Sequence, residues 1–136
     1  MAEEMLRGSC LCGGVAFEMT SPFVFFHHCH CSRCQKSSGS AFGANILVKA
    51  AQFRWIKGEE FVGHWELPEA QYYCTGWCTV CGSKLPWESR NKKGFLVPVG
   101  TLDDDPGSQP EKNIYWASRP PWYANPADLP TFDEGS

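Results

Sequence analysis

The sequence has no excess of basic residues. Its 136 residues include 12 Lys and Arg against 15 Asp and Glu, which gives a formal net charge of −3. A protein that binds nucleic acid through a basic face needs clustered positive charge, so we expect no nucleic-acid partner. Long apolar runs are missing as well. No stretch approaches the roughly 20 apolar residues that span a bilayer, and we expect no membrane partner.

The N-terminal segment does not have the features of a secretory signal. Such a signal begins with positive charge and continues with an apolar stretch, whereas this chain begins MAEEMLRGSCLC. We therefore expect a cytoplasmic protein. The chain also lacks low-complexity tracts, and its length is typical of one domain. We predict a single domain over residues 1–136.

The hydrophobic pattern is that of short β-strands. The segment GGVAFEM alternates, which places Val15, Phe17 and Met19 on one face of a strand. Three further segments are strand-like: ANILVKAAQFRWIKG, in which Ala-Ala separates two apolar runs, GFLVPVGTL and NIYWAS. Turn residues separate these segments, which predicts an all-β protein with short helical turns. One short helix is expected to follow Cys34, where serines and a glycine weaken helix formation.

The C-terminal tail, about residues 115–136, is rich in proline and aromatic residues. The segment SRPPWYANPADLPTFDEGS holds four of the ten prolines. Because proline disfavours a helix interior, we expect an extended or irregular tail. Its aromatic residues Trp122, Tyr123 and Phe132 predict that it packs on the domain.

Eight cysteines are many for this length, and they fall into three groups. In a secreted protein an even count permits four disulfides. Thiols stay reduced in the cytosol, and closely spaced cysteine pairs chelate metal well, so we favour metal binding. The groups are Cys10 and Cys12; Cys29, Cys31 and Cys34; and Cys74, Cys78 and Cys81.

The first and third groups predict a structural zinc site. CTVCG has the form of a zinc knuckle, in which Cys78 and Cys81 bind one metal and Gly82 leaves the turn with positive φ. SCLCGG supplies two more ligands, since residues i and i+2 of a strand share a face. We predict a closed cage of Cys10, Cys12, Cys78 and Cys81 that clips two distant segments together. Buried packing cysteines are the alternative.

The middle group, CHCSRC, predicts a second zinc site with three ligands. Cys29, Cys31 and Cys34 can hold one metal from a single local turn, which leaves a fourth position for water or a substrate atom. Cys74 is the candidate for a fourth ligand, and it would make this site structural. A buried free cysteine is the interpretation of Cys74 that we favour.

Three of the four histidines lie beside the middle group and are candidates for further site residues. His27 shares strand parity with the first two cysteines of the middle group, whereas His28 and His30 should point away from the metal. Each of the three could donate a hydrogen bond or carry a proton near the site, although a structural role is the more ordinary one. His64 is isolated and receives no role.

Four segments, in order, resemble the glutathione-dependent formaldehyde-activating enzyme (Gfa-like) family, which also includes centromere protein V. They are GSCLCGGVAFE, HHCHCSRCQKSSGSAFGANI, CTVCGSKL and WASRPPWY…DLPTF. The cysteine pattern and the tail motif are independent matches, and together they cover nearly the whole chain. The resemblance implies a β-tent, a mostly antiparallel β domain built round a structural zinc.

The resemblance also implies a reaction and two Zn²⁺ ions per chain. The family's activity is that of a carbon–sulfur lyase, run towards addition, in which glutathione and formaldehyde give S-hydroxymethylglutathione. The implied structural zinc ligands are Cys10, Cys12, Cys78 and Cys81, and the implied ligands of the catalytic zinc are Cys29, Cys31 and Cys34. Cys74 is unusual for the family.

Charge compensation is needed at the implied catalytic zinc, because three thiolates leave that site at net −1. Candidate compensating groups are Arg33, Lys36 and the Ser37–Ser38 region, although a solvated face is the ordinary interpretation of both basic residues. Two other functions stay open. The chain could be a scaffold module with two structural zincs, or a thiol redox protein whose middle group holds no metal.

Overall fold

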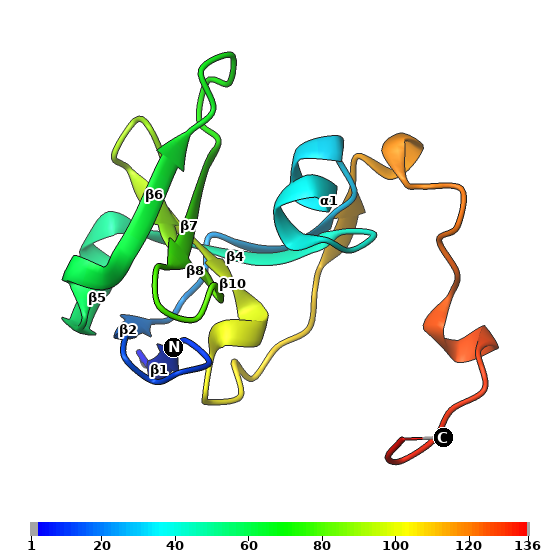
Figure 1. Ribbon diagram of the computed structural model, residues 1–136, viewed down its shortest axis with the longest axis horizontal. Coiled ribbons are helices and arrows are strands. Elements are labelled where there is room, and N and C mark those ends of the chain that lie inside the picture. The colour runs from blue at the N-terminus through cyan, green and yellow to red at the C-terminus, as the bar shows by residue number, and fades with distance from the viewer. Residues whose placement is uncertain (1–2, 136) are drawn as a thin grey trace.

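The computed structural model describes residues 3–135 and is built mainly of β-strands in three sheets (Figure 1). The first sheet has the order β1-β2-β5, with β1 Met5–Ser9, β2 Ala16–Thr20 and β5 Phe53–Lys57. The second has the order β11-β3-β4-β10-β9, with β11 Lys112–Ile114, β3 Phe25–Cys29, β4 Gly43–Lys49, β10 Gly94–Pro98 and β9 Trp87–Glu88. The third has the order β6-β7-β8, with β6 Val62–Glu66, β7 Cys74–Cys78 and β8 Lys84–Leu85.

The mainly β fold predicted from the sequence is confirmed. All strand pairs are antiparallel except β11 with β3, which is parallel. One α-helix, α1 Ser32–Ser38, joins β3 to β4. Short 3-10 turns complete the connections: η1 Ala50–Gln52, η2 Glu59–Phe61, η3 Val99–Thr101, η4 Trp116–Ser118 and η5 Pro126–Asp128.

The main core lies between the first and second sheets. The alternating residues Val15, Phe17 and Met19 are all almost fully buried, as predicted. Phe17 and Met19 pack with Ile46 and Val48 of β4 in the largest hydrophobic cluster. Within the first sheet, Gly8 of β1 lies against the ring of its partner Phe17 on β2, and an added Cβ would lie 2.2 Å from that ring. A glycine is therefore required at this contact.

A second, smaller core joins the first sheet to the third, and cysteines form part of it. Cys10 and Cys78 pack there with Val15 and Leu85. In Figure 1 the green β6–β7 hairpin projects from the body of the molecule. The second core lies at the base of this hairpin, because Cys78 ends β7 and pairs with Val62 at the start of β6.

Two segments differ in detail from the sequence prediction. The helix after β3 begins at Ser32, before Cys34, because Cys31 caps it and accepts a hydrogen bond from the Cys34 N–H. It ends at Ser38, where Gly39 adopts φ +67°. In NIYWAS only Ile114 and the residue before it continue a strand, because Tyr115 has φ 55° and starts a 3-10 turn.

The C-terminal tail is irregular, as expected, and in Figure 1 its orange and red ribbon extends away from the sheets. Tyr123 packs its ring edge-on against His30 and Trp116. Trp122 and Phe132, which we expected to pack on the domain, are 67% and 62% exposed. Four prolines remove backbone donors from this segment, which limits its hydrogen bonding to the sheets.

Among residues 3–135, no helix has both the length and the apolar character that crossing a membrane requires. All eight cysteines fall within this part of the chain, and each is a free thiol.

Candidate metal centres

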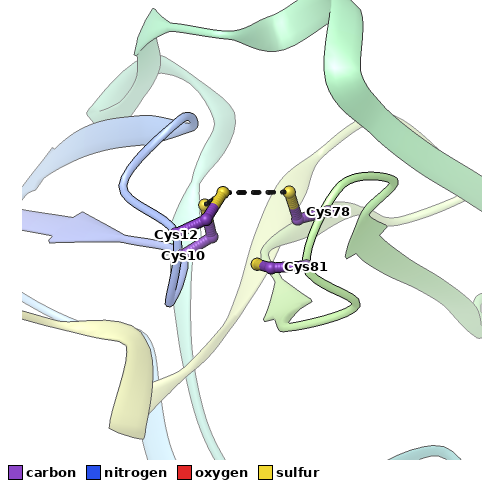
Figure 2. A group of neighbouring side chains, drawn as sticks. All are labelled: Cys10, Cys12, Cys78 and Cys81. Carbon is purple, nitrogen blue, oxygen red and sulfur yellow. Dashed lines mark hydrogen bonds between the residues drawn. The ribbon is translucent and has the colours of Figure 1, made fainter.

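Four cysteines from two distant parts of the chain converge at one point (Figure 2). Cys10 and Cys12 lie in the turn between β1 and β2, whereas Cys78 ends β7 and Cys81 lies in the turn between β7 and β8. Their four sulfur atoms all lie within 4.8 Å of one another. Cys12 Sγ is 3.5 Å from Cys10 Sγ and 3.9 Å from Cys78 Sγ. We name these four residues the closed cluster; its donor set suits a tetrahedral metal such as zinc.

The backbone at Cys10 and Cys12 is a turn, where the sequence predicted a strand. The Gly13 N–H donates to the Cys10 carbonyl at 3.0 Å, and Gly13 has φ +76°. The turn brings both sulfurs to the same side, which strand periodicity was expected to do. Backbone N–H groups also approach the sulfur atoms, since the Val15 N–H donates to Cys10 Sγ at 3.3 Å.

The second half of the closed cluster has the predicted knuckle geometry. Gly82 has φ +78°, and its N–H donates to the Cys78 carbonyl at 2.8 Å. Ser83, which sequence reasoning missed, connects the two halves. Its Oγ accepts a hydrogen bond from the Leu11 N–H at 2.9 Å and lies 3.1 Å from Cys81 Sγ. Hydrogen bonds from the Ser83 side chain and backbone lower the pKa of Cys81 to about 5, which favours the thiolate that a metal binds.

The three cysteines of the middle group also converge, and we name them the open cluster. Cys29 ends β3, Cys31 caps α1, and Cys34 lies in the first turn of that helix. Their sulfur atoms all lie within 4.8 Å of one another. Among residues 3–135, no fourth Cys, His, Asp or Glu ligand atom lies within that distance of all three. Three protein ligands and an unfilled position are typical of catalytic zinc sites.

The open cluster is built for a cation. Hydrogen bonds from the thiols of Cys29 and Cys34 lower the pKa of Cys31 to about 2. The hydrogen bond with Cys31 raises the pKa of Cys29, and hydrogen bonds with Cys29 and Cys31 raise the pKa of Cys34. The thiolate is therefore favoured at Cys31 and disfavoured at its two neighbours. A divalent cation would allow the other two thiols to ionise as well, so these residues fit zinc.

A cavity of about 810 Å³ opens onto the open cluster. All three cysteines line it, together with His27 and Arg33. The opposite wall comes from the segment before β7 and from the tail. It includes Gln71, Tyr72, Tyr73, Tyr115 and Ser118. A smaller cavity of about 300 Å³ adjoins it, and Cys34, Asn45, Tyr73 and Trp87 line both.

The three histidines near the open cluster have different surroundings. His27 lines the larger cavity, in agreement with its strand parity, and stacks on Phe25 at 4.1 Å between ring centroids. His28 stacks on Phe42. His30 is fully buried, and its Nε2 lies 3.0 Å from Asn113 Oδ1. Of the three, only His27 therefore lies where it can meet a ligand in the larger cavity.

Charged and hydroxyl groups near the cavities include some that the sequence did not reveal. Arg33 is exposed and lines the larger cavity, whereas Lys36 is exposed and lines neither cavity. Ser37 and Ser38 line the smaller one. Lys84 also lines the smaller cavity; burial lowers its pKa, and the charge of Cys34 acts in the opposite direction.

Tyr73 is a further residue that sequence reasoning missed. Its hydroxyl lies 2.5 Å from Ser37 Oγ and donates to the Arg33 carbonyl at 3.3 Å. Burial raises its pKa to about 12, so the phenol keeps its proton at neutral pH. Sequence spacing could not reveal the contact between these two hydroxyl groups, because Tyr73 lies 36 residues from Ser37.

Cys74 lies apart from the open cluster. It is fully buried, and its thiol donates to the Tyr72 carbonyl at 3.7 Å. Its sulfur atom lies within 4.8 Å of ligand atoms of His64 and Glu66. Burial raises the pKa of this thiol, and the charge of Glu66 adds to the effect. Cys74 is therefore buried and lies outside the open cluster.

Comparison with known proteins identifies related chains. A family model described as "Glutathione-dependent formaldehyde-activating enzyme" matches residues 5–118. A curated protein of Halomonas elongata, named "Putative glutathione-dependent formaldehyde-activating enzyme", is 29% identical over 125 residues, which is 87% of this chain and 79% of that protein. A crystal structure of a Rhodobacter sphaeroides protein aligns with a TM-score of 0.57 and 23% identity, over 76% of this chain and 97% of that one. The last likeness concerns the fold.

Proposed function

Because this chain belongs to the glutathione-dependent formaldehyde-activating enzyme family, we propose that it joins a thiol to a small aldehyde. The thiol is glutathione, the aldehyde is formaldehyde, and the product is S-hydroxymethylglutathione, so the chain acts as a carbon–sulfur lyase in the direction of addition. One observation carries the proposal. The open cluster has three thiols, and it faces a cavity of about 810 Å³ that has room for a small peptide thiol.

We propose two Zn²⁺ ions per chain, one in each cluster. The closed cluster offers four sulfur ligands and holds a structural ion, whereas the open cluster offers three and holds the catalytic one. A zinc ion in the open cluster supplies a Lewis acid that lowers the pKa of a bound thiol and polarises a carbonyl. The remaining tasks are binding, orientation and proton transfer, and they fall to side chains of the cavity.

Tyr73 is the group that we assign to proton transfer. Addition forms a carbon–sulfur bond as the π bond of the aldehyde carbonyl breaks, which leaves a negative charge on the former aldehyde oxygen, and the thiol proton is released to solvent. The Tyr73 hydroxyl is protonated at neutral pH and can donate to that oxygen, while Ser37 holds it in position at 2.5 Å. The Tyr73 hydroxyl takes up a proton from solvent when the product leaves. General acids of this kind typically contribute about 10²–10⁴-fold in rate.

Two cationic side chains balance the charge and orient the thiol substrate. Arg33 lines the larger cavity from its exposed side, where it can bind a carboxylate of the tripeptide. Lys84 lines the smaller cavity with Cys34 and donates from Nζ to Thr75 Oγ1 at 2.8 Å. Its positive charge offsets the net −1 of a zinc ion with three thiolates.

A scaffold with two structural zincs is less well supported. Such a scaffold needs a fourth ligand at the open cluster, and Cys74 was the candidate. Cys74 lies instead beside His64 and Glu66. We further propose that the chain works in the cytoplasm, where free thiols stay reduced, and that its partners are small molecules rather than nucleic acid or membranes.

The test is the rate of S-hydroxymethylglutathione formation, measured by NMR exchange spectroscopy against the spontaneous reaction. The zinc-loaded protein should accelerate exchange, and the Cys31→Ser protein should not. If the zinc-loaded wild type leaves the spontaneous rate unchanged, the proposed reaction is wrong. A loss of acceleration on adding a chelator, with recovery on adding Zn²⁺, would separate the lyase from a metal-free redox protein.

A further inference from the structure

We propose that His64, Glu66 and Cys74 form a third metal site, for a divalent transition metal such as Zn²⁺, at the distal end of the β6–β7 hairpin. We name these three residues the hairpin site. Its donor atoms are His64 Nε2, Glu66 Oε2 and Cys74 Sγ, with a solvent water as the fourth ligand. The inference does not depend on the proposed reaction, because none of the three residues lines either cavity.

Strand register brings the three donors together. In the antiparallel β6–β7 pair, Glu66 lies directly opposite Cys74, and His64 lies opposite Gly76. Directly opposed residues in such a pair point to the same face of the sheet, and His64 shares that face because it lies two residues before Glu66. One ligand atom from each residue lies within 4.8 Å of the other two. The convergence is therefore a property of the hairpin backbone.

The distances suit a single small cation. His64 Nε2 lies 3.8 Å from Glu66 Oε2. Nitrogen and oxygen ligands of one tetrahedral zinc, each about 2.0–2.1 Å from it, are roughly 3.3 Å apart. The side chains of His64 and Glu66 are 40% and 44% exposed, so both can rotate slightly to close this gap. Cys74 is fully buried and supplies the fixed point of the site.

An outer group orients the carboxylate, as is common around metal ligands. Arg90 Nε lies 3.8 Å from Glu66 Oε1. The arginine is itself held, because its guanidinium donates to the carbonyls of Leu67 at 3.0 Å and Ala70 at 2.8 Å. One carboxylate oxygen thus faces a fixed arginine, and the other faces His64. A thiolate and a carboxylate together balance the charge of a divalent ion.

The hairpin site also has a consequence for the larger cavity. The connection between β6 and β7, residues 67–73, begins and ends at its ligands, and Gln71, Tyr72 and Tyr73 in this connection line the larger cavity. A metal bound by Glu66 and Cys74 would fasten both ends of that connection. Metal binding at the hairpin would therefore restrict the motion of the cavity wall.

The experiment is a Zn²⁺ titration of the full chain, prepared with both cysteine clusters already loaded, followed through the imidazole NMR signals of His64. In the wild type these signals should shift and saturate at one further equivalent of Zn²⁺, with native mass spectrometry showing three ions. In Cys74→Ser the dissociation constant for that equivalent should rise at least tenfold. The Cys31→Ser protein, prepared with the closed cluster alone loaded, is the control, since its His64 response should match that of the wild type.

Two outcomes would overturn the hairpin site. Wild-type His64 signals that do not move at one equivalent would show that no metal binds there. Equal responses in the wild type and in Cys74→Ser would show that the sulfur is not a ligand. If Cys74→Ser fails to fold, Glu66→Gln replaces it, because this exposed side chain can be changed without a cavity. A Glu66→Gln affinity equal to that of the wild type would also overturn the site.

Discussion

The two cysteine clusters use the same ligand in different structural settings. The closed cluster joins two turns that are far apart in sequence, since Cys12 and Cys78 are separated by 66 positions, and Ser83 connects its two halves. The open cluster lies within one strand end and one helical turn, and it faces a cavity. Metal bound at the closed cluster would therefore tie two distant segments of the fold together, whereas metal bound at the open cluster would constrain little beyond α1.

From this difference we expect the closed cluster to stabilise the fold and the open cluster to carry the chemistry. A site that closes a long loop contributes most to folding, and four ligands leave no position for a substrate. A local site with three ligands contributes little to folding and keeps one position open. The comparison can be tested by changing one cluster at a time.

The largest effect is expected for Cys78→Ser. Structural zinc sites contribute about 10–16 kcal/mol of apparent binding free energy, which equals or exceeds the stability of a typical domain. The variant should therefore fail to fold, as measured by far-UV circular dichroism and by zinc content. A melting curve like that of the wild type would contradict the structural role of the closed cluster.

Cys31→Ser should have the opposite profile. We expect it to lose metal from the open cluster and more than about 100-fold in activity, while its melting temperature stays close to the wild-type value. Zinc content should fall by one equivalent. If this variant unfolds as Cys78→Ser does, the two clusters do not differ in the way that their positions in the chain suggest.

Tyr73→Phe removes the proposed proton donor and leaves both clusters intact. We expect kcat to fall about 100-fold, with unchanged zinc content and little change in KM. Tyr72→Phe is the matched control, since Tyr72 is the adjacent residue and lines the same cavity. Equal rates for the two variants would assign proton transfer to another group.

Ser83→Ala should have the smallest effect. It removes the hydroxyl that bonds Cys81 and accepts the Leu11 N–H, which should cost about 1–2 kcal/mol and lower the melting temperature by about 3–8 °C. Activity per folded molecule should not change. Ser40→Ala, at an exposed serine after α1, is the control and should melt as the wild type does.

The sequence predicted those parts of the fold and site that depend on local spacing. Alternation placed Val15, Phe17 and Met19 on one face, which is buried, and cysteine spacing grouped seven cysteines into two clusters, each of which converges. The conformation at Cys10 and Cys12 was predicted wrongly, because a turn with a positive-φ glycine can align two sulfurs as well as a strand can. Spacing alone does not distinguish the two conformations.

Other parts could not be predicted, because they depend on contacts between distant segments. Tyr73 meets Ser37, and Lys84 reaches the cavity beside Cys34, only through the arrangement of the second and third sheets. His64 looked isolated in the sequence, and strand register alone placed it beside Cys74. The aromatic residues of the tail were expected to pack on the domain, but Trp122 and Phe132 are exposed.

The two adjoining cavities have a kinetic consequence. Cys34, Asn45, Tyr73 and Trp87 line both of them, so the larger and the smaller space meet at these side chains. A bulky thiol needs the larger space, whereas an aldehyde of a few atoms fits the smaller. If each reactant occupies its own space, neither blocks the binding of the other. Turnover would then follow a random-order scheme, without inhibition when either reactant is in excess.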